Sequence, residues 1–147
     1  NRKQIASTID VMPTLLDVAG LEGPESMQGQ SLLPVLRGKV ETLPRNHAII
    51  ETEFYHIGIR TPTHLYGMEI LDTGFIDEWP YFPTEPGAKR ACLFDLKADP
   101  YQQRNLIGQP QHVALEATLH QQLTTWNDET SWLLGKPPPL PNWMRKQ

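Results

Sequence analysis

The sequence has 147 residues and a formal net charge of −4. Hydrophobic residues make up 39% of it and charged residues 20%, which is the composition of a globular chain rather than a disordered one. Because no basic patch is present, nucleic acid is not an expected partner. No apolar run approaches the roughly 20 residues that a membrane-spanning helix needs, so a membrane is not an expected partner either.

The chain starts at Asn1 without an initiator Met or a secretory leader, and a structured-looking segment follows within a few residues. We therefore expect a fragment of a longer protein. Its single cysteine, Cys92, excludes an intramolecular disulfide, and the cellular compartment stays open.

The first predicted helix lies within Ile5–Gly20. Ser7 or Thr8 is its expected N-cap, and Pro13 falls in the first turn, where its missing N–H removes no helical hydrogen bond. Asp10 is interpreted as a group that caps or pairs at the helix start rather than as a metal ligand. Apolar side chains recur at helical spacing and give the helix one apolar face: Ile9, Met12, Leu15, Leu16 and Ala19.

A second short helix is expected after a glycine-rich turn. Ser31 is its predicted cap, Pro34 lies in its first turn, and Gly38 ends it. A polar connection, Lys39–Asn46, then leads to a region whose apolar residues recur with a period of two.

Four strands are predicted in this region, because runs rich in β-branched and aromatic residues are bounded by turn residues. Short turns between neighbouring strands favour antiparallel pairing. The long loop Asp72–Arg90 carries Phe75 and the aromatic stretch Trp79–Phe82, and separates the third strand from the fourth. The predicted strands are His47–Glu53, Tyr55–Arg60, His64–Ile70 and Ala91–Leu96.

The last predicted helix spans Pro110–Trp126, and Glu116 lies off its apolar face. The tail Gly135–Gln147 is rich in proline and is expected to form neither helix nor central strand. The fold class is therefore α+β: a small antiparallel sheet of about four strands packs against a long C-terminal helix, and two short helices precede it. The apolar face of the last helix consists of Leu115, Leu119, Leu123 and Trp126.

Several residues with chemically useful side chains are interpreted structurally. Asp95, Asp99 and Asn105 are expected to stabilise turns through hydrogen bonds to the backbone rather than to bind a cation. Cys92 lies in a predicted strand and has no Pro-x-Arg after it, so it is expected to be a small buried residue rather than a nucleophile.

The histidines give no metal-binding pattern. His47 and His64 are expected to be structural or exposed. His112 and His120 are eight residues apart on one predicted helix, whereas facing ligands usually lie three or four residues apart.

Four stretches resemble motifs of the sulfatases, a family within the alkaline phosphatase superfamily. Ser7–Gly20 is similar to the family's S-x-x-D-x-x-P-T-L-L-D-x-A-G helix, and Gly29–Gly38 to its G-x-S-L-L-P-L-L-x-G segment. Ile59–Pro62 resembles an R-T strand turn, and Leu93–Leu106 is similar to L-Y-D-L-x-x-D-P-x-E-x-x-N-L. The four stand in the family's order and cover most of the chain up to Trp126.

The resemblance implies a place for this chain in such an enzyme. Residues 1–46 would be the end of the large α/β sulfatase domain, to which the two short helices belong. Residues 47–130 would be the C-terminal subdomain, and residues 131–147 a proline-rich tail. The expected partners are the missing N-terminal catalytic domain and a sulfate-ester substrate.

The family's chemistry is implied to lie outside this chain. A formylglycine, made from the Cys or Ser of a C/S-x-P-S-R motif, attacks sulfur, and a divalent cation such as Ca²⁺ or Mg²⁺ polarises the sulfate. Neither that motif nor a metal-binding motif occurs in the sequence. The chain alone is therefore expected to have no catalytic residue and no metal ligand, and to be inactive.

Glu53, Tyr55 and His56 are the candidate substrate-binding residues. In the fold that the resemblance implies, the connection after the first strand of the subdomain approaches the mouth of the active site. His56 or Tyr55 would there contact the alcohol part of the ester. The alternative is a solvated hairpin with an ordinary surface histidine.

Two other functions stay open. Phosphonate or phosphate monoester hydrolysis uses a similar scaffold, and a non-catalytic interaction module would use the aromatic loop or an extended helix at Pro137–Pro141.

The predicted helix Ile9–Ala19 would normally pack on the missing domain. The isolated chain is therefore expected to self-associate.

Overall fold

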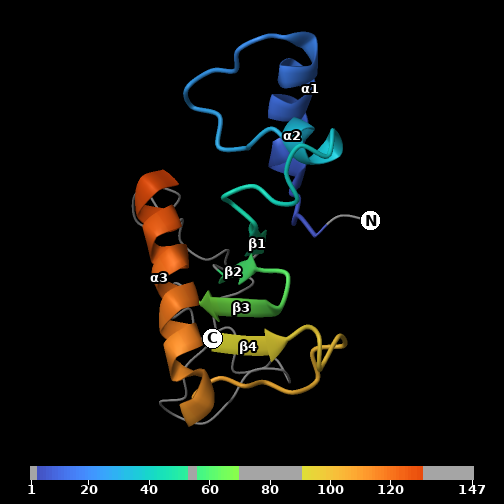
Figure 1. Ribbon diagram of the computed structural model, residues 1–147. Helices are drawn as coiled ribbons and strands as arrows, with labels where there is room; N and C mark the ends of the chain where they lie inside the picture. Colours follow the sequence, from blue (N-terminus) through green and yellow to red (C-terminus); the bar gives the residue numbers. More distant parts are fainter. Residues whose placement is uncertain (1–2, 53–55, 70–90, 131–147) are drawn as a thin grey trace, which may run out of the picture.

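The computed structural model describes residues 3–52, 56–69 and 91–130 (Figure 1). The aromatic loop and the proline-rich tail lie outside the described residues. In chain order the elements are η1 (Thr8–Asp10), α1 (Val11–Ala19), α2 (Leu33–Leu36), β1 (Ala48–Thr52), β2 (His56–Arg60), β3 (His64–Glu69), β4 (Ala91–Asp95), η4 (Pro110–His112) and α3 (Val113–Thr130).

The first helix begins and ends at residues that the sequence analysis singled out. The backbone N–H of Ser7 donates to Asp10 Oδ2 at 2.9 Å, so Asp10 pairs at the helix start as expected. Gly20 follows α1 with a φ of +70°, and the N–H of Leu21 donates to the carbonyl oxygen of Leu16 at 2.9 Å. These bonds satisfy groups that a helix end otherwise leaves unpaired.

The second helix is one turn long, and its expected cap is displaced by one residue. Leu32, not Ser31, occupies the N-cap position. Ser31 Oγ nevertheless accepts a hydrogen bond from the N–H of Leu33 at 3.2 Å, and it donates to Asp17 of α1. Because the hydroxyl is shared with α1, it supports the helix start from outside the cap position. Gly38, with a φ of +72°, ends the turn as expected.

The four strands form one antiparallel sheet in the order β1-β2-β3-β4. Each strand is paired with its neighbour in sequence, as the short turns predict. Ile59 of β2 lies opposite Ile49 of β1 and Tyr66 of β3, and Tyr66 lies opposite Leu93 of β4. Residues that face each other across neighbouring strands lie on the same side of a sheet, so these four define its apolar face.

Helix α3 covers this apolar face, and the core lies between the two layers. Leu119, 3% exposed, and Leu123, fully buried, come from α3. Leu115 and Trp126 pack at the edge of the same cluster, as predicted. The buried core members are Ile57, Ile59, Tyr66, Ala91, Leu93, Leu106, Leu119 and Leu123. The α+β fold class is therefore confirmed.

Glu116 departs from the expected pattern for α3. It was placed off the apolar face, yet it is only 7% exposed. Its Oε1 accepts a hydrogen bond from the N–H of Gly108 at 2.6 Å. A carboxylate that accepts a backbone N–H is tolerated in a buried position, and this bond ties α3 to the loop that leads into it.

The turn after β4 is stabilised as the sequence analysis predicts. Asp95 Oδ1 accepts the N–H groups of Lys97 and Ala98 at 2.8 and 3.0 Å, and Asp99 Oδ2 accepts that of Arg104 at 2.8 Å. These backbone hydrogen bonds lower the pKa of both carboxyl groups. The bond from Ala98 contributes most for Asp95, and the bond from Arg104 contributes most for Asp99.

The two N-terminal helices lie beyond the β1 end of the sheet, away from β4 (Figure 1). The chain between α2 and β1 connects them to it. Gln4 Nε2 donates to the carbonyl oxygen of Arg45 at 2.8 Å, and Gln30 Nε2 donates to the same oxygen at 2.6 Å. No helix within the described residues is long and apolar enough to cross a bilayer.

Candidate functional site

Of the three candidate substrate-binding residues, only His56 lies within the described part of the chain. Glu53 and Tyr55 lie outside it. His56 is half-buried and begins β2, opposite Thr52 of β1 and Glu69 of β3. Since its neighbour Ile57 belongs to the core beneath α3, the alternation of side chains places His56 on the other side of the sheet.

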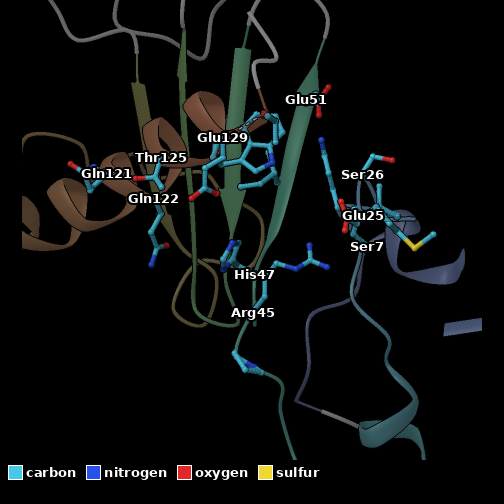
Figure 2. Close-up of a pocket in the computed structure, with 17 residues that line it drawn as sticks. Ser7, Glu25, Ser26, Arg45, His47, Glu51, Gln121, Gln122, Thr125 and Glu129 are labelled. Atoms are coloured by element: carbon cyan, nitrogen blue, oxygen red, sulfur yellow. Dashed lines mark hydrogen bonds between the residues drawn. The ribbon is translucent and has the colours of Figure 1, made fainter. Parts of the chain in front are cut away.

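A cleft of about 790 Å³ lies on the α3 side of β1. Figure 2 shows the three parts of the chain that line it. They are β1 with the residues just before it, the last turns of α3, and Ser7 together with the segment 25–28. Its volume lies within the range of small-molecule pockets. The residues with polar side chains that line it are Ser7, Glu25, Ser26, Gln28, Arg45, His47, Glu51, Gln121, Gln122, Thr125, Glu129 and Thr130.

Arg45 is fixed at the edge of this cleft by a buried partner. Its Nη2 atom forms an ion pair with Oδ1 of Asp10, a residue only 1% exposed. The same carboxylate accepts the N–H groups of Ser7 and Gln30 at 2.9 and 3.0 Å. Asp10 therefore joins the start of η1, the segment before α2 and the lead-in to β1 at one point.

His47 lies next to this ion pair and lines the cleft. Burial, and secondly the positive charge of Arg45, lower the pKa of its imidazole. The neutral form is favoured because both effects oppose a second positive charge. The cleft is thus lined by the guanidinium that Asp10 holds, by an imidazole whose pKa is lowered, and by the carboxylates of Glu25, Glu51 and Glu129.

His56 and the cleft do not form one site. Glu51, which lines the cleft, lies opposite Ile57 in the register, whereas His56 lies opposite Thr52. The two therefore occupy opposite faces of the sheet. Sequence analysis did not identify the cleft, because Asp10 and Arg45 are 35 residues apart and no local pattern links them.

Cys92 is a free, half-buried thiol in β4. Burial is the main cause that raises its pKa, and a raised pKa disfavours the thiolate that a nucleophile requires. Cys92 is thus less buried than expected, and its interpretation as a structural residue remains a prediction.

The described residues do not fit a divalent cation. Within residues 3–52, 56–69 and 91–130, no group of three or more His, Cys, Asp and Glu residues is placed to hold a metal ion. His120, one of the histidines weighed above, instead lies with Nδ1 3.2 Å from the Tyr66 hydroxyl. No catalytic step is therefore assigned to a metal on this part of the chain.

Comparison with protein families identifies the architecture. A family model described as "N-sulphoglucosamine sulphohydrolase, C-terminal" matches residues 1–129. The chain belongs to this family. The match covers all of the elements from η1 to β4 and all but the last residue of α3, so the resemblance of the four motifs to sulfatases is confirmed.

Two relatives of this chain are named as a sulfatase and as a member of the alkaline phosphatase superfamily. The ulvan-active sulfatase of Formosa agariphila is 27% identical in an alignment that is 152 positions long and includes 84% of this chain and 29% of that protein. The multifunctional alkaline phosphatase superfamily protein PehA of Trinickia caryophylli is 32% identical over 123 residues, 82% of this chain and 24% of its own length.

A solved structure has the same fold. A protein in complex with its substrate D-glucosamine-2-N,6-O-disulfate superposes with a TM-score of 0.63 at 26% identity, over 83% of this chain and 24% of that chain. The chain thus spans less than a third of the length of each of these relatives.

Proposed function

We propose that this chain is the C-terminal portion of a sulfuric ester hydrolase whose nucleophile and cation are supplied by another part of the protein. The match of residues 1–129 to the C-terminal sulphohydrolase family is the observation that carries this proposal. Two facts add support: the four sulfatase-like motifs occur in the family's order, and the relatives are more than three times as long as the matched segment.

The proposed role of the chain is to complete the fold and one side of the substrate pocket. Residues 1–46 would form the end of the large domain, residues 47–130 the C-terminal subdomain, and residues 131–147 its tail. His56 would contact the alcohol part of the ester, together with Glu53 and Tyr55. The support for His56 is its place at the start of β2, directly after the connection that holds the other two residues.

The chemistry of sulfur attack would belong to the remainder of the enzyme. A formylglycine supplies the nucleophile in enzymes of this type, and a divalent cation such as Ca²⁺ or Mg²⁺ stabilises charge on the sulfate. This chain's own contribution would be binding and orientation, which raise the effective concentration of the reacting groups.

A sister reaction is the second candidate. Hydrolysis of phosphonate or phosphate monoesters is favoured by one observation, the 32% identity to a multifunctional member of the alkaline phosphatase superfamily. An interaction module without catalysis is the third candidate, and its proposed surfaces, the aromatic loop and the proline-rich tail, lie outside the described residues.

A substrate panel separates the first two functions. The longer protein that contains this chain is assayed with matched aryl esters of sulfate, phosphate and phosphonate. We expect the highest kcat/KM for the sulfate ester. A higher kcat/KM for the phosphonate or phosphate ester would contradict the first proposal, and no turnover of any ester would support the interaction module.

The proposed role of His56 has its own test in the same protein. His56→Ala is expected to raise KM for the sulfate ester by roughly tenfold with a small change in kcat, because a contact to the leaving alcohol is a binding contact. His64→Ala is the matched control, since His64 lies at the other end of the sheet and bonds to Thr63. Equal kinetic effects of both substitutions would contradict the assignment.

A further inference from the structure

The N-terminal part, residues 3–38, is joined to the sheet and α3 mainly through one stretch of chain. Among the described elements, η1, α1 and α2 do not pack extensively on any strand or on α3 (Figure 1). Within the described residues the chain crosses between the two parts once, through residues 39–47. The cleft is lined from both parts. Its shape therefore depends on how the N-terminal part is oriented relative to the sheet.

The end of this crossing is bound by the N-terminal part instead of forming a free linker. Gln4 Oε1 accepts the N–H of Leu43 at 2.6 Å. The N–H of Ile5 donates to Asn46 Oδ1 at 2.7 Å. We call residues 43–46 the clamped segment. Because it ends shortly before β1, these bonds act where the chain enters the sheet.

Asp10 is the buried charge at the centre of this contact. It is 1% exposed and forms the ion pair with Arg45 of the clamped segment. The same carboxylate accepts the N–H groups of Ser7 and Gln30 from the N-terminal part. A buried carboxylate that loses its cationic partner is left as an uncompensated charge, which is strongly unfavourable. The N-terminal part therefore cannot turn away from the clamped segment without breaking an interaction that is costly to lose.

A second ion pair in the same region provides an internal comparison. Lys3 Nζ lies 2.8 Å from Glu41 Oε1, and the two side chains are 78% and 68% exposed. Ion pairs in contact with water contribute little, because solvent screens the charges and mobile side chains lose entropy when they pair. Of the two pairs, the one between Asp10 and Arg45 is therefore expected to fix the orientation.

We propose that Asp10 is a positioning residue: through Arg45 it fixes the orientation of the sheet relative to the N-terminal part, and with it the geometry of the cleft. This inference rests on the proposed function, in which the same junction separates the large domain from the C-terminal subdomain. His56 begins β2, so its place relative to an ester held by the large domain depends on this pair. A displacement of about 1 Å can cost roughly a hundredfold in rate.

The first test measures the orientation in the 147-residue chain. Spin labels are attached to Ala19→Cys on α1 and Ala117→Cys on α3, two exposed positions, with Cys92→Ala removing the native thiol. The distribution of distances between the labels is measured by double electron–electron resonance. Labelled chains are diluted with unlabelled ones, so that only distances within one molecule are observed.

The charge pair gives a cycle of variants. Asp10→Asn and Arg45→Gln each leave one charge without its partner, so each is expected to widen the distance distribution at least twofold. The double variant leaves neither charge, and its two amides can still form a hydrogen bond, so its distribution is expected to return toward that of the parent chain. Lys3→Gln, which removes the exposed pair, is the matched control and should leave the distribution unchanged.

A purely stabilising role for Asp10 predicts a different result. The unfolding temperature of the single variants would then fall while the distance distribution of the folded chain stayed as narrow as in the parent, and this outcome overturns the proposal. If neither single variant folds, Arg45→Lys is measured instead, because it keeps the charge but not the planar geometry of the guanidinium. A smaller widening is expected there, and an unchanged distribution overturns the proposal as well.

The longer protein that contains this chain adds a catalytic readout, taken at a temperature at which all variants are folded. We expect kcat/KM for an aryl sulfate to fall roughly tenfold in Asp10→Asn, to recover in the double variant, and to be unchanged in Lys3→Gln. An unchanged kcat/KM in Asp10→Asn overturns the positioning role and leaves the proposed function intact. If the longer protein hydrolyses no sulfate ester, the proposed function fails, and the distance distribution alone decides the role of Asp10.

Discussion

Tyr66 combines a buried position with an ionisable group. Its ring is 5% exposed in the core, and its hydroxyl lies 3.2 Å from Nδ1 of His120. Burial first, and then the charges of Glu116 and Cys92, raise the pKa of the phenol to about 12. The neutral phenol is thus the form that the folded chain favours.

We predict that Tyr66 makes the chain sensitive to alkaline pH. The folded state binds the phenol proton more tightly than the unfolded state, so its contribution to the unfolding free energy is complete below pH 10. That contribution is lost as the pH rises through about 12. Tyr66→Phe should remove this loss, as measured by denaturant unfolding at a series of alkaline pH values. An identical pH dependence in both proteins would refute the assignment.

Gly29 is the residue whose substitution should disturb the N-terminal part most directly. In Gly29→Ala the new methyl carbon would meet the carbonyl oxygen of Ile9 at 2.0 Å and Pro13 Cγ at 3.0 Å. We expect a loss of stability of about 1–3 kcal/mol in this region, seen as faster amide hydrogen exchange in α1. In Gly23→Ala the methyl carbon meets mainly the flexible end of Met27, so a clearly smaller effect is expected.

At the scale of elements, Asn105 attaches the chain after the turn to strand β4. Its Oδ1 accepts the N–H groups of Leu93 and Ile107 at 2.9 and 3.1 Å, and its Nδ2 donates to the carbonyl oxygen of Ala91 at 3.2 Å. The N–H of Leu106 continues the pairing by donating to the oxygen of Leu93 at 2.8 Å. The side chain therefore pairs with the backbone of β4 much as a neighbouring strand would.

Asn105→Ala should destabilise the sheet because it leaves these backbone groups unpaired. The expected decrease in the unfolding free energy is about 1–3 kcal/mol, measured by chemical denaturation. Gln103→Ala removes an exposed amide from the same turn and should change stability by less than about 0.5 kcal/mol. If the two variants are equally stable, Asn105 does not hold the edge of β4.

The sheet was predictable from the sequence because its signals are local. Alternation and turn residues located all four strands to within about two residues of their bounds. Helix α3 continues to Thr130, whereas the predicted helix ends at Trp126. The prediction ended early because the residues after Trp126 are polar and do not extend the apolar pattern. The Thr130 hydroxyl donates to the carbonyl oxygen of Trp126 at 2.8 Å.

Contacts between separate segments of the chain were not predictable. Periodicity carries no information on the ion pair between Asp10 and Arg45, or on the bond between Glu116 and the N–H of Gly108, because both depend on how separate segments meet. Asp10 was correctly interpreted as a helix-start residue, and only its second role, as a partner of Arg45, was missed. The candidate substrate residues remain a prediction.

At the scale of the whole molecule, the apolar side chains that α1 exposes have a consequence for the chain on its own. An exposed apolar surface of this kind favours association of like molecules. We predict that the average mass of the 147-residue chain, measured by light scattering, rises with concentration. Leu15→Glu should shift it toward the monomer, whereas Val113→Glu, at a similarly exposed position on α3, should not. A monomer at all concentrations would contradict this prediction.

The central claim is that this chain completes a sulfatase whose reactive centre lies elsewhere in the protein. Turnover of an aryl sulfate tests it most directly, measured for the purified 147-residue chain and for the longer protein that contains it. We predict turnover by the longer protein and none by the chain alone. Turnover by the isolated chain, or inactivity of the correctly folded longer protein, would contradict the account.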